Sequence, residues 1–152
     1  MLEENIKNMQ MNYRDAKYSD LKIIKELLQK SNLQSVDCEE HLNNFILIED
    51  KGKIVGVGGL EIYDDVGLLR SIVVIPENRG NGIGKKIYLL IEERASSLGV
   101  NVLFLLTETA EKYFSNLGFS VKYRNEVPAS IKGTKQFKEL CSFSAKVMFR
   151  EL

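Results

Sequence analysis

The residues with the clearest chemical purpose form a glycine-rich turn between an apolar segment and a helical pattern. Residues 72–85 read Ile-Val-Val-Ile-Pro-Glu-Asn-Arg-Gly-Asn-Gly-Ile-Gly-Lys. Such a turn at a helix N-terminus presents several backbone N–H groups, so this segment predicts a site for a phosphate group. Arg79 and Lys85 are expected to add charge-assisted hydrogen bonds to phosphate oxygens. The alternative is a strand-to-helix turn that binds nothing.

The glycine spacing excludes two common phosphate loops. The nucleoside-triphosphate loop requires G-x-x-x-x-G-K-[ST], but Gly80 and Gly84 are one residue too close, and Lys86 occupies the hydroxyl position. The dinucleotide fingerprint requires G-x-G-x-x-G, and here Gly80-x-Gly82 is followed by Lys85 instead of a third glycine. What remains is Arg79-x-x-Gly82-x-Gly84.

Two strands and a helix must position this turn. Residues 68–75 predict a strand before it, and residues 102–106 form a continuous apolar run typical of a strand that is covered on both faces. Between them, apolar residues recur at helical spacing, and Gly99 is expected to end that helix: Ile83, Ile87, Leu90, Ile91, Ala95 and Leu98. This βαβ unit predicts two parallel strands with a right-handed crossover.

The remaining elements follow from local patterns. Ser19 is the expected N-cap of a helix over Leu21–Lys30, and Gly56, Gly58 and Gly59 suggest a bulge or a close backbone approach. Before the turn we expect a loosely held start at residues 1–9, strands at 12–16, 45–48 and 53–63, and a short helix at 37–43. After it we expect helices at 108–116, closed by Gly118, and within 128–139, and strands at 119–123 and 142–149.

Composition limits the class of protein. The 152 residues suit one domain, and 21 basic residues balance 21 acidic ones, which argues against nucleic-acid or anionic-membrane partners. Cys38 and Cys141 are far apart and there is one histidine, His41, so no metal site is expected. No apolar run is long enough to cross a bilayer, and a reduced cytoplasmic location is expected.

The motif Arg79-x-x-Gly82-x-Gly84 resembles the pyrophosphate-binding motif of the GCN5-related N-acetyltransferases (GNAT), which bind acetyl-coenzyme A (acetyl-CoA). Residues 107–119, ending in Leu-Gly-Phe, are similar to a short helix of that family. Residues 68–71 and the segment 127–148 resemble the small acetyltransferases of bacterial arsenic-resistance operons and, more distantly, the acetyltransferase domain of N-acetylglutamate synthase.

The resemblance implies one N-acetyltransferase domain over residues 1–152 with an α/β (α+β) fold. That fold is a mixed, mostly antiparallel twisted sheet with helices on both faces and a central parallel βαβ unit that binds acetyl-CoA. The resemblance assigns the pantetheine arm to backbone groups of Ile72, Val73, Val74 and Ile75. It assigns the pyrophosphate to the amides of Arg79, Gly80, Asn81, Gly82, Ile83, Gly84 and Lys85, and adds Thr107 and Phe114 to the cofactor-binding residues.

Acetyl transfer to an amine requires a base for the amine proton and an acid for the leaving thiolate. The family's usual tyrosine falls at Phe114, so the neighbouring Tyr113 is the candidate acid, with packing as the alternative. Glu61 is the preferred base, acting through water, and the alternative is a solvent-facing carboxylate. Glu108 is a weaker candidate because an acid there would also favour a helix N-terminus.

For the acceptor, Arg70 is expected to bind a substrate carboxylate or to form a surface salt bridge, and Ser144 to border the acceptor groove or face water. The expected function is therefore acetyl transfer from acetyl-CoA to a small-molecule amine, such as an amino acid or an amino-acid-like toxin. A non-catalytic CoA-binding sensor and a transferase for longer acyl chains are the alternatives. A homodimer is a further possibility.

Overall fold

A computed structural model describes residues 11–140 and 145–152. The elements up to the glycine turn are β1 (Met11–Asp15), η1 (Tyr18–Asp20), α2 (Leu21–Lys30), η2 (Cys38–Asn44), β2 (Phe45–Asp50), β3 (Lys53–Tyr63) and β4 (Val66–Val74). From the turn onwards they are η3 (Pro76–Asn78), α3 (Ile83–Ser97), β5 (Val102–Thr107), α4 (Glu111–Asn116), β6 (Ser120–Lys122), η4 (Arg124–Glu126), α5 (Ala129–Lys132), α6 (Lys135–Leu140) and β7 (Lys146–Glu151).

The strands form one seven-stranded sheet with the hydrogen-bonded order β1-β2-β3-β4-β5-β7-β6. The pairs β1–β2, β2–β3, β5–β7 and β6–β7 are antiparallel, whereas β4 and β5 are parallel. The predicted mixed, mostly antiparallel sheet with a parallel βαβ unit is therefore confirmed. The β4–β5 register covers only residues 66–68 and 102–104.

The described residues divide into two compact units. The first unit comprises residues 11–59 and 71–91, and the second comprises residues 60–70, 92–140 and 145–152. Among all described residues, none lies in a helix with the length and apolar character needed to cross a membrane.

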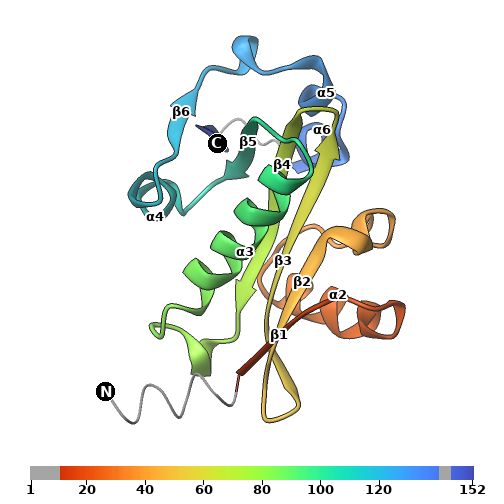
Figure 1. The fold of residues 1–152 in the computed structure, drawn as a ribbon. Coiled ribbons are helices and arrows are strands. Elements are labelled where there is room, and N and C mark those ends of the chain that lie inside the picture. Colours follow the sequence, from red (N-terminus) through yellow and green to blue (C-terminus); the bar gives the residue numbers. More distant parts are fainter. Residues whose placement is uncertain (1–10, 141–144) are drawn as a thin grey trace. The chain divides into compact units, whose positions relative to one another are not determined.

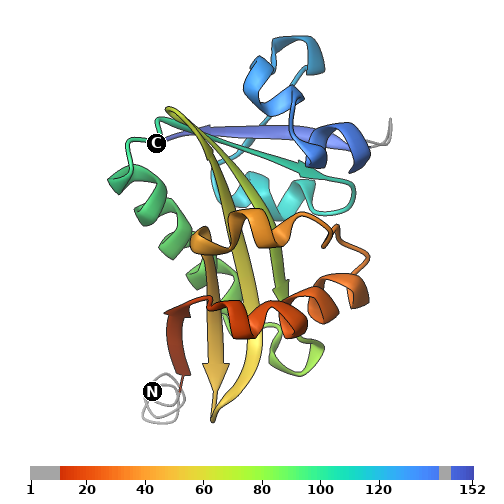
Figure 2. The same ribbon diagram turned by 90° about the vertical axis from the view of Figure 1, so that its right-hand side faces the viewer.

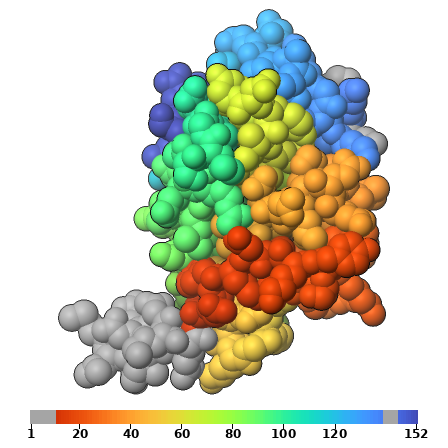
Figure 3. Space-filling model, turned by 45° about the vertical axis from the view of Figure 1, so that its right-hand side comes forward, coloured from red at the N-terminus to blue at the C-terminus, as the bar shows by residue number. Residues whose placement is uncertain are grey.

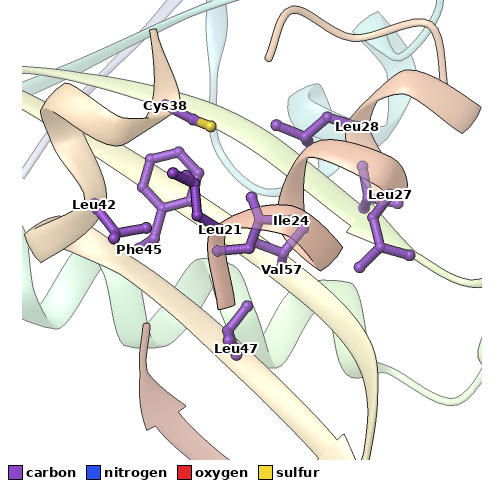
Figure 4. Close-up of a cluster of buried hydrophobic side chains, with 10 residues drawn as sticks. Leu21, Ile24, Leu27, Leu28, Cys38, Leu42, Phe45, Leu47 and Val57 are labelled. Atoms are coloured by element: carbon purple, nitrogen blue, oxygen red, sulfur yellow. The ribbon is translucent and has the colours of Figure 1, made fainter. Parts of the chain in front are cut away.

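A hydrophobic cluster on one face of the sheet forms the core of the first unit (Figure 4). Figures 1 and 2 show α2 on this face of the strands, and Figure 3 shows α2 and η2 next to each other at the surface. The cluster joins α2, η2 and the strands through Leu21, Ile24, Leu27, Leu28, Cys38, Leu42, Phe45, Leu47, Val57 and Val73. The helix α2 thus buries the face that carries Leu21, Ile24, Leu27 and Leu28.

The first part of α3 packs on the opposite face of the same strands (Figures 1 and 2). Gly56 and Gly58 make this packing possible, because a Cβ at Gly56 would lie 3.2 Å from Ile87 Cδ1, and one at Gly58 would lie 2.9 Å from Ile91 Cδ1. A Cβ at Gly59 would meet the Phe45 ring at 2.6 Å. The expected close approach at these glycines is confirmed.

Two details of the helices differ from the prediction. Ser19 is not an N-cap, because α2 begins at Leu21, after Asp20, and Ser19 lies within the 3₁₀ turn η1. The Asp20 carboxylate accepts hydrogen bonds from the Lys17 N–H (2.7 Å) and from Arg14, which fixes this turn ahead of the helix. Leu98, which was predicted to lie on the apolar stripe of the helix, follows the end of α3 and is 54% exposed, whereas Tyr88 within α3 is fully buried.

Strand β4 contains a residue in the left-handed region of backbone space. Ser71 has φ +63° in the interior of the strand, directly after the buried Arg70. A non-glycine residue rarely adopts this conformation, and in a strand it interrupts the regular pleat. One of the three places where the chain passes from one unit to the other is here, between Arg70 and Ser71.

The second unit has its own core around Leu68, Phe104, Val127, Ile131 and Val147. The centres of the Phe104 and Phe149 rings lie 6.3 Å apart. The partly buried side chains that pack against this core are Tyr63, Val66, Val102, Leu106, Phe137 and Phe149. The final strand, predicted for residues 142–149, is observed as β7, and residues 142–144 lie outside the described part of the chain.

Candidate functional site

The glycine turn runs from the end of β4 to the first residue of α3 within the first unit. Ile75 and Arg79 are extended on either side of the short turn η3, and Gly80 and Gly82 then take φ values of +84° and +77°. Only glycine enters this left-handed region without strain, which explains two of the three glycines. A Cβ at Gly80 or Gly82 would meet no atom within 4 Å, so the space beside these two glycines is open.

The amides of this turn precede the hydrogen-bonded part of α3. Lys86 N–H donates to the Gly82 carbonyl oxygen (3.0 Å), and this bond opens the helical pattern. The first N–H groups of a helix have no intrahelical acceptor, and the positive end of the helix dipole lies among them. The amides of Ile83, Gly84 and Lys85 are therefore placed where an anion would be bound, with the exposed Lys85 side chain beside them.

The side chains of Arg79 and Lys86 make different contacts around the turn. Arg79 turns back onto the preceding strand, and its Nε donates to the Val74 carbonyl oxygen at 2.9 Å. This bond holds the start of the turn against the end of β4. Next to Lys85, the Nζ of Lys86 lies 5.7 Å from the centre of the Tyr13 ring, a cation–π distance.

The predicted pantetheine strand is partly occupied by internal hydrogen bonds. Ile75 N–H donates to the Val55 carbonyl oxygen at 2.9 Å, so this amide is directed towards β3. Backbone groups alternate in direction along a strand, and those of Ile72 and Val74 are therefore expected at the other edge. Since Val74 already accepts from Arg79, Ile72 is the residue of this segment whose backbone best fits the predicted role.

In the second unit, Glu61 is the centre of a buried polar cluster. Arg70 Nη1 donates to Glu61 Oε2 at 2.9 Å, and each side chain is 1% exposed. The hydroxyl of Tyr63 donates to the other carboxylate oxygen, Oε1. Both side chains are buried, so the two alternatives that placed Glu61 and Arg70 at the surface are wrong. Inside the protein, the two opposite charges compensate each other.

Thr107 is the last residue of β5, and Glu108 begins the turn that follows. The Thr107 hydroxyl oxygen accepts the Ala110 N–H at 2.9 Å, and α4 begins only at Glu111. The predicted helix start at residue 108 is therefore wrong, since the threonine bond holds residues 107–110 in a non-helical turn. Glu108 is exposed and precedes the helix instead of occupying its first turn.

Tyr113 and Phe114 lie on α4 in a small aromatic group. The Tyr113 and Phe114 rings pack edge to face with their centres 5.2 Å apart. Phe114 packs in the same way against the buried Phe119, with the ring centres 5.8 Å apart. Tyr113 is 42% exposed, and its partial burial raises the pKa of its hydroxyl above the ordinary value of 10.0. The hydroxyl is thus protonated throughout the neutral range, as an acid requires.

The structure groups the predicted residues by unit. The first unit holds the residues of the turn and residues 72–75, and the second unit holds Glu61, Arg70, Thr107, Glu108, Tyr113 and Phe114. Ser144 lies outside the described residues. Sequence reasoning missed Tyr63, although the spacing Glu61-x-Tyr63 in a predicted strand already places both side chains on one face.

Comparison with known proteins adds to this geometry. The model of the acetyltransferase (GNAT) family matches residues 6–119, more than half of the chain. No curated protein sequence matches the chain.

Several solved structures have the same fold. N-acetylglutamate synthase from Neisseria gonorrhoeae, complexed with CoA and N-acetyl-glutamate, superimposes with a TM-score of 0.83 at 22% identity, over 93% of this chain and 35% of that one. Rv2747 from Mycobacterium tuberculosis, in complex with CoA and NLQ, superimposes with a TM-score of 0.78 at 26% identity, over 93% of this chain and 99% of that one. A GNAT-family acetyltransferase from Staphylococcus aureus superimposes with a TM-score of 0.74 at 19% identity, over 93% of this chain and 99% of that one.

The chain spans about a third of the length of the synthase, so the likeness to that enzyme concerns one part of it. The family match covers the glycine turn, the parallel strands and the Leu-Gly-Phe segment, which are the features that sequence reasoning used to predict a coenzyme A site. On these grounds the chain belongs to the acetyltransferase (GNAT) family.

Proposed function

We propose that this protein transfers the acetyl group of acetyl-CoA to the amine of a small molecule, such as an amino acid or an amino-acid-like toxin. The observation that carries the proposal is the turn between β4 and α3. It combines two left-handed glycines, open space above them, helix-terminal amides and the exposed Lys85. That combination fits a phosphate or pyrophosphate group.

On the cofactor side, the amides of residues 80–85 and the Lys85 ammonium would hold the pyrophosphate, and the backbone of Ile72 would meet the pantetheine arm. Arg79 would act on the shape of the turn through its bond to Val74. Acetyl-CoA supplies an acyl group activated as a thioester. The chain's own contribution there is binding and orientation.

On the acceptor side, Glu61 would take the proton of the amine through water. Arg70 Nη1 lies 2.9 Å from this carboxylate inside the protein, so we assign Arg70 the role of counter-ion. Tyr113, protonated at neutral pH, would donate a proton to the departing sulfur. An amino-acid acceptor is supported by the solved structure of the Neisseria gonorrhoeae synthase, which holds CoA with N-acetyl-glutamate.

The proposal is tested by titrating acetyl-CoA into the protein in a calorimeter and by assaying turnover with a panel of amino acids and other small amines. Lys85→Glu should weaken binding by about 10- to 100-fold, because it replaces a charge-assisted bond to phosphate by repulsion. Lys22→Glu is the matched control, since it makes the same charge change at an exposed position on α2 and should leave binding unaltered.

Failure to bind acetyl-CoA would refute the proposal, and equal affinities for the two variants would refute the role of the turn. Tight binding without turnover of any acceptor would instead favour a CoA-binding sensor. The observation that keeps this second candidate is Phe114, which has no hydroxyl at the position of the family's usual tyrosine.

A further inference from the structure

The buried cluster around Glu61 contains a residue to which no role has yet been given. Tyr63 lies two residues after Glu61 on β3, so the two side chains leave the same face of the strand. Its hydroxyl donates to Glu61 Oε1, while Arg70 Nη1 donates to Oε2 at 2.9 Å. Each oxygen of the carboxylate therefore has a donor from a different side chain.

The two donors differ in what they do for the carboxylate. Arg70 brings a full positive charge and compensates the buried negative charge of Glu61. Tyr63 is uncharged and contributes only a directed hydrogen bond. A carboxylate has about four lone-pair sites. Two donors on separate oxygens thus restrain the rotation of the carboxylate plane.

The Tyr63 hydroxyl is itself held in place by packing. Its ring packs against the buried cluster of Leu68, Phe104, Val127, Ile131 and Val147, all within the second unit. A side chain whose ring is locked in a core cannot follow the carboxylate if the carboxylate rotates. Through Tyr63, the hydrophobic core of the second unit therefore restrains the orientation of the Glu61 carboxylate.

We propose that Tyr63 is a positioning residue for acetyl transfer, which orients the Glu61 carboxylate to accept the amine proton. This inference rests on the proposed function, and specifically on Glu61 as the base. Tyr63 touches neither substrate nor cofactor in this role and acts only through Glu61. Its removal should lower the rate of the proton transfer and leave the binding of both substrates nearly intact.

The test is Tyr63→Phe, which keeps the ring in the core and removes only the hydroxyl. We expect kcat to fall by about 10- to 100-fold, part of the contribution of a general base, while the KM values for acetyl-CoA and acceptor change less than about twofold. Tyr123→Phe is the matched control, because it removes the hydroxyl of a 75% exposed tyrosine of the same unit and should retain full kcat.

A double-mutant cycle separates positioning from general loosening of the structure. If Tyr63 acts through Glu61, Tyr63→Phe should cause no further loss of kcat when Glu61→Gln is already present. A wild-type kcat in Tyr63→Phe would overturn the proposal. So would losses that multiply in the double mutant, because they would show an effect independent of Glu61.

A second measurement reads the same contact without turnover. In protein labelled with ¹³C at glutamate carboxyl groups, the Glu61 signal is identified by its disappearance in Glu61→Gln. It should shift in Tyr63→Phe and stay in place in Tyr123→Phe, and an unshifted signal in Tyr63→Phe would overturn the proposal. An inactive wild type with a shifted signal would refute the proposed function while retaining the contact of Tyr63 with Glu61.

Discussion

Replacing Gly58 by alanine tests how the first unit places the glycine turn. Gly58 lies on β3 beneath α3, and a Cβ there would overlap Ile87 Cγ2 and lie 2.9 Å from Ile91 Cδ1. Carbon atoms prefer separations of about 3.5–4.0 Å. Both isoleucines are fully buried, so neither can swing into solvent to make room.

The size of the effect follows from this overlap. Inserting a carbon into a well-packed core usually costs about 1–3 kcal/mol, and two rigid, buried partners place Gly58→Ala at the upper end, at about 2–3 kcal/mol. For a chain of this length each kcal/mol lowers the melting temperature by about 2–4 °C, so we expect a fall of about 4–12 °C. The strain is relieved by moving α3 away from β3, which displaces the amides that begin it.

The assay combines thermal unfolding with calorimetric titration of acetyl-CoA. Gly56→Ala is the matched control on the same strand and face, where a Cβ would lie 3.2 Å from Ile87 Cδ1 and 3.5 Å from Ile83 Cγ2. The milder crowding at this position destabilises the fold less. Alanine also lowers the conformational entropy of the unfolded chain, which stabilises the folded state by about 0.4–1 kcal/mol and offsets that loss. We therefore expect near wild-type stability and affinity for Gly56→Ala, and losses of both for Gly58→Ala.

One outcome would refute the reasoning. If Gly58→Ala melts at the wild-type temperature, α3 cannot lie as close to β3 as the structure has it. A companion test is Gly58→Ala combined with Ile87→Ala, which removes the clashing Cγ2. The double variant should be destabilised by less than the sum of the two single changes, and simple additivity would exclude the contact as the cause.

Two further perturbations address the ionic groups. The hydrogen bonds from Arg14 hold the pKa of Asp20 below its ordinary value of 3.8, so this carboxylate stabilises the fold above about pH 4 and loses its contribution as pH falls through the lowered pKa. Asp20→Asn should therefore unfold more easily than wild type at neutral pH, and this gap should narrow in acid when unfolding midpoints are compared across pH. Arg70→Met leaves the buried Glu61 carboxylate without its counter-ion and should cost about 3–5 kcal/mol in denaturant unfolding. Adding Glu61→Gln should recover part of that loss, and a double variant no more stable than Arg70→Met would contradict the pairing.

Sequence patterns predicted the fold well where one signal was strong. The bounds of β3, Lys53–Tyr63, and of α2, Leu21–Lys30, were predicted to the residue, because a hairpin turn and a helical stripe define them. The errors occurred where a side chain competes for backbone groups. Asp20 accepts the Lys17 N–H and so places Ser19 inside a 3₁₀ turn, and Thr107 accepts the Ala110 N–H ahead of α4, which delays the start of that helix.

The site shows a similar division. The turn was predictable because its glycines, its basic residues and its position between strand and helix are all local in sequence. The pair of Glu61 with Arg70 was not, since it depends on which residues of β3 and β4 come to lie opposite each other. Their residue types suggested that Glu61 and Arg70 would be functional, but only the folded structure shows that they form an ion pair.

Ser71 has a consequence for which sequences this fold can accept. A pattern search would treat the position as an ordinary strand residue and rank valine or isoleucine as improvements. With φ at +63°, the backbone instead favours glycine, asparagine or aspartate, and a β-branched residue would be strained at the junction of the two units. A design or consensus method that scores β4 by strand propensity alone would therefore propose damaging substitutions at this one position.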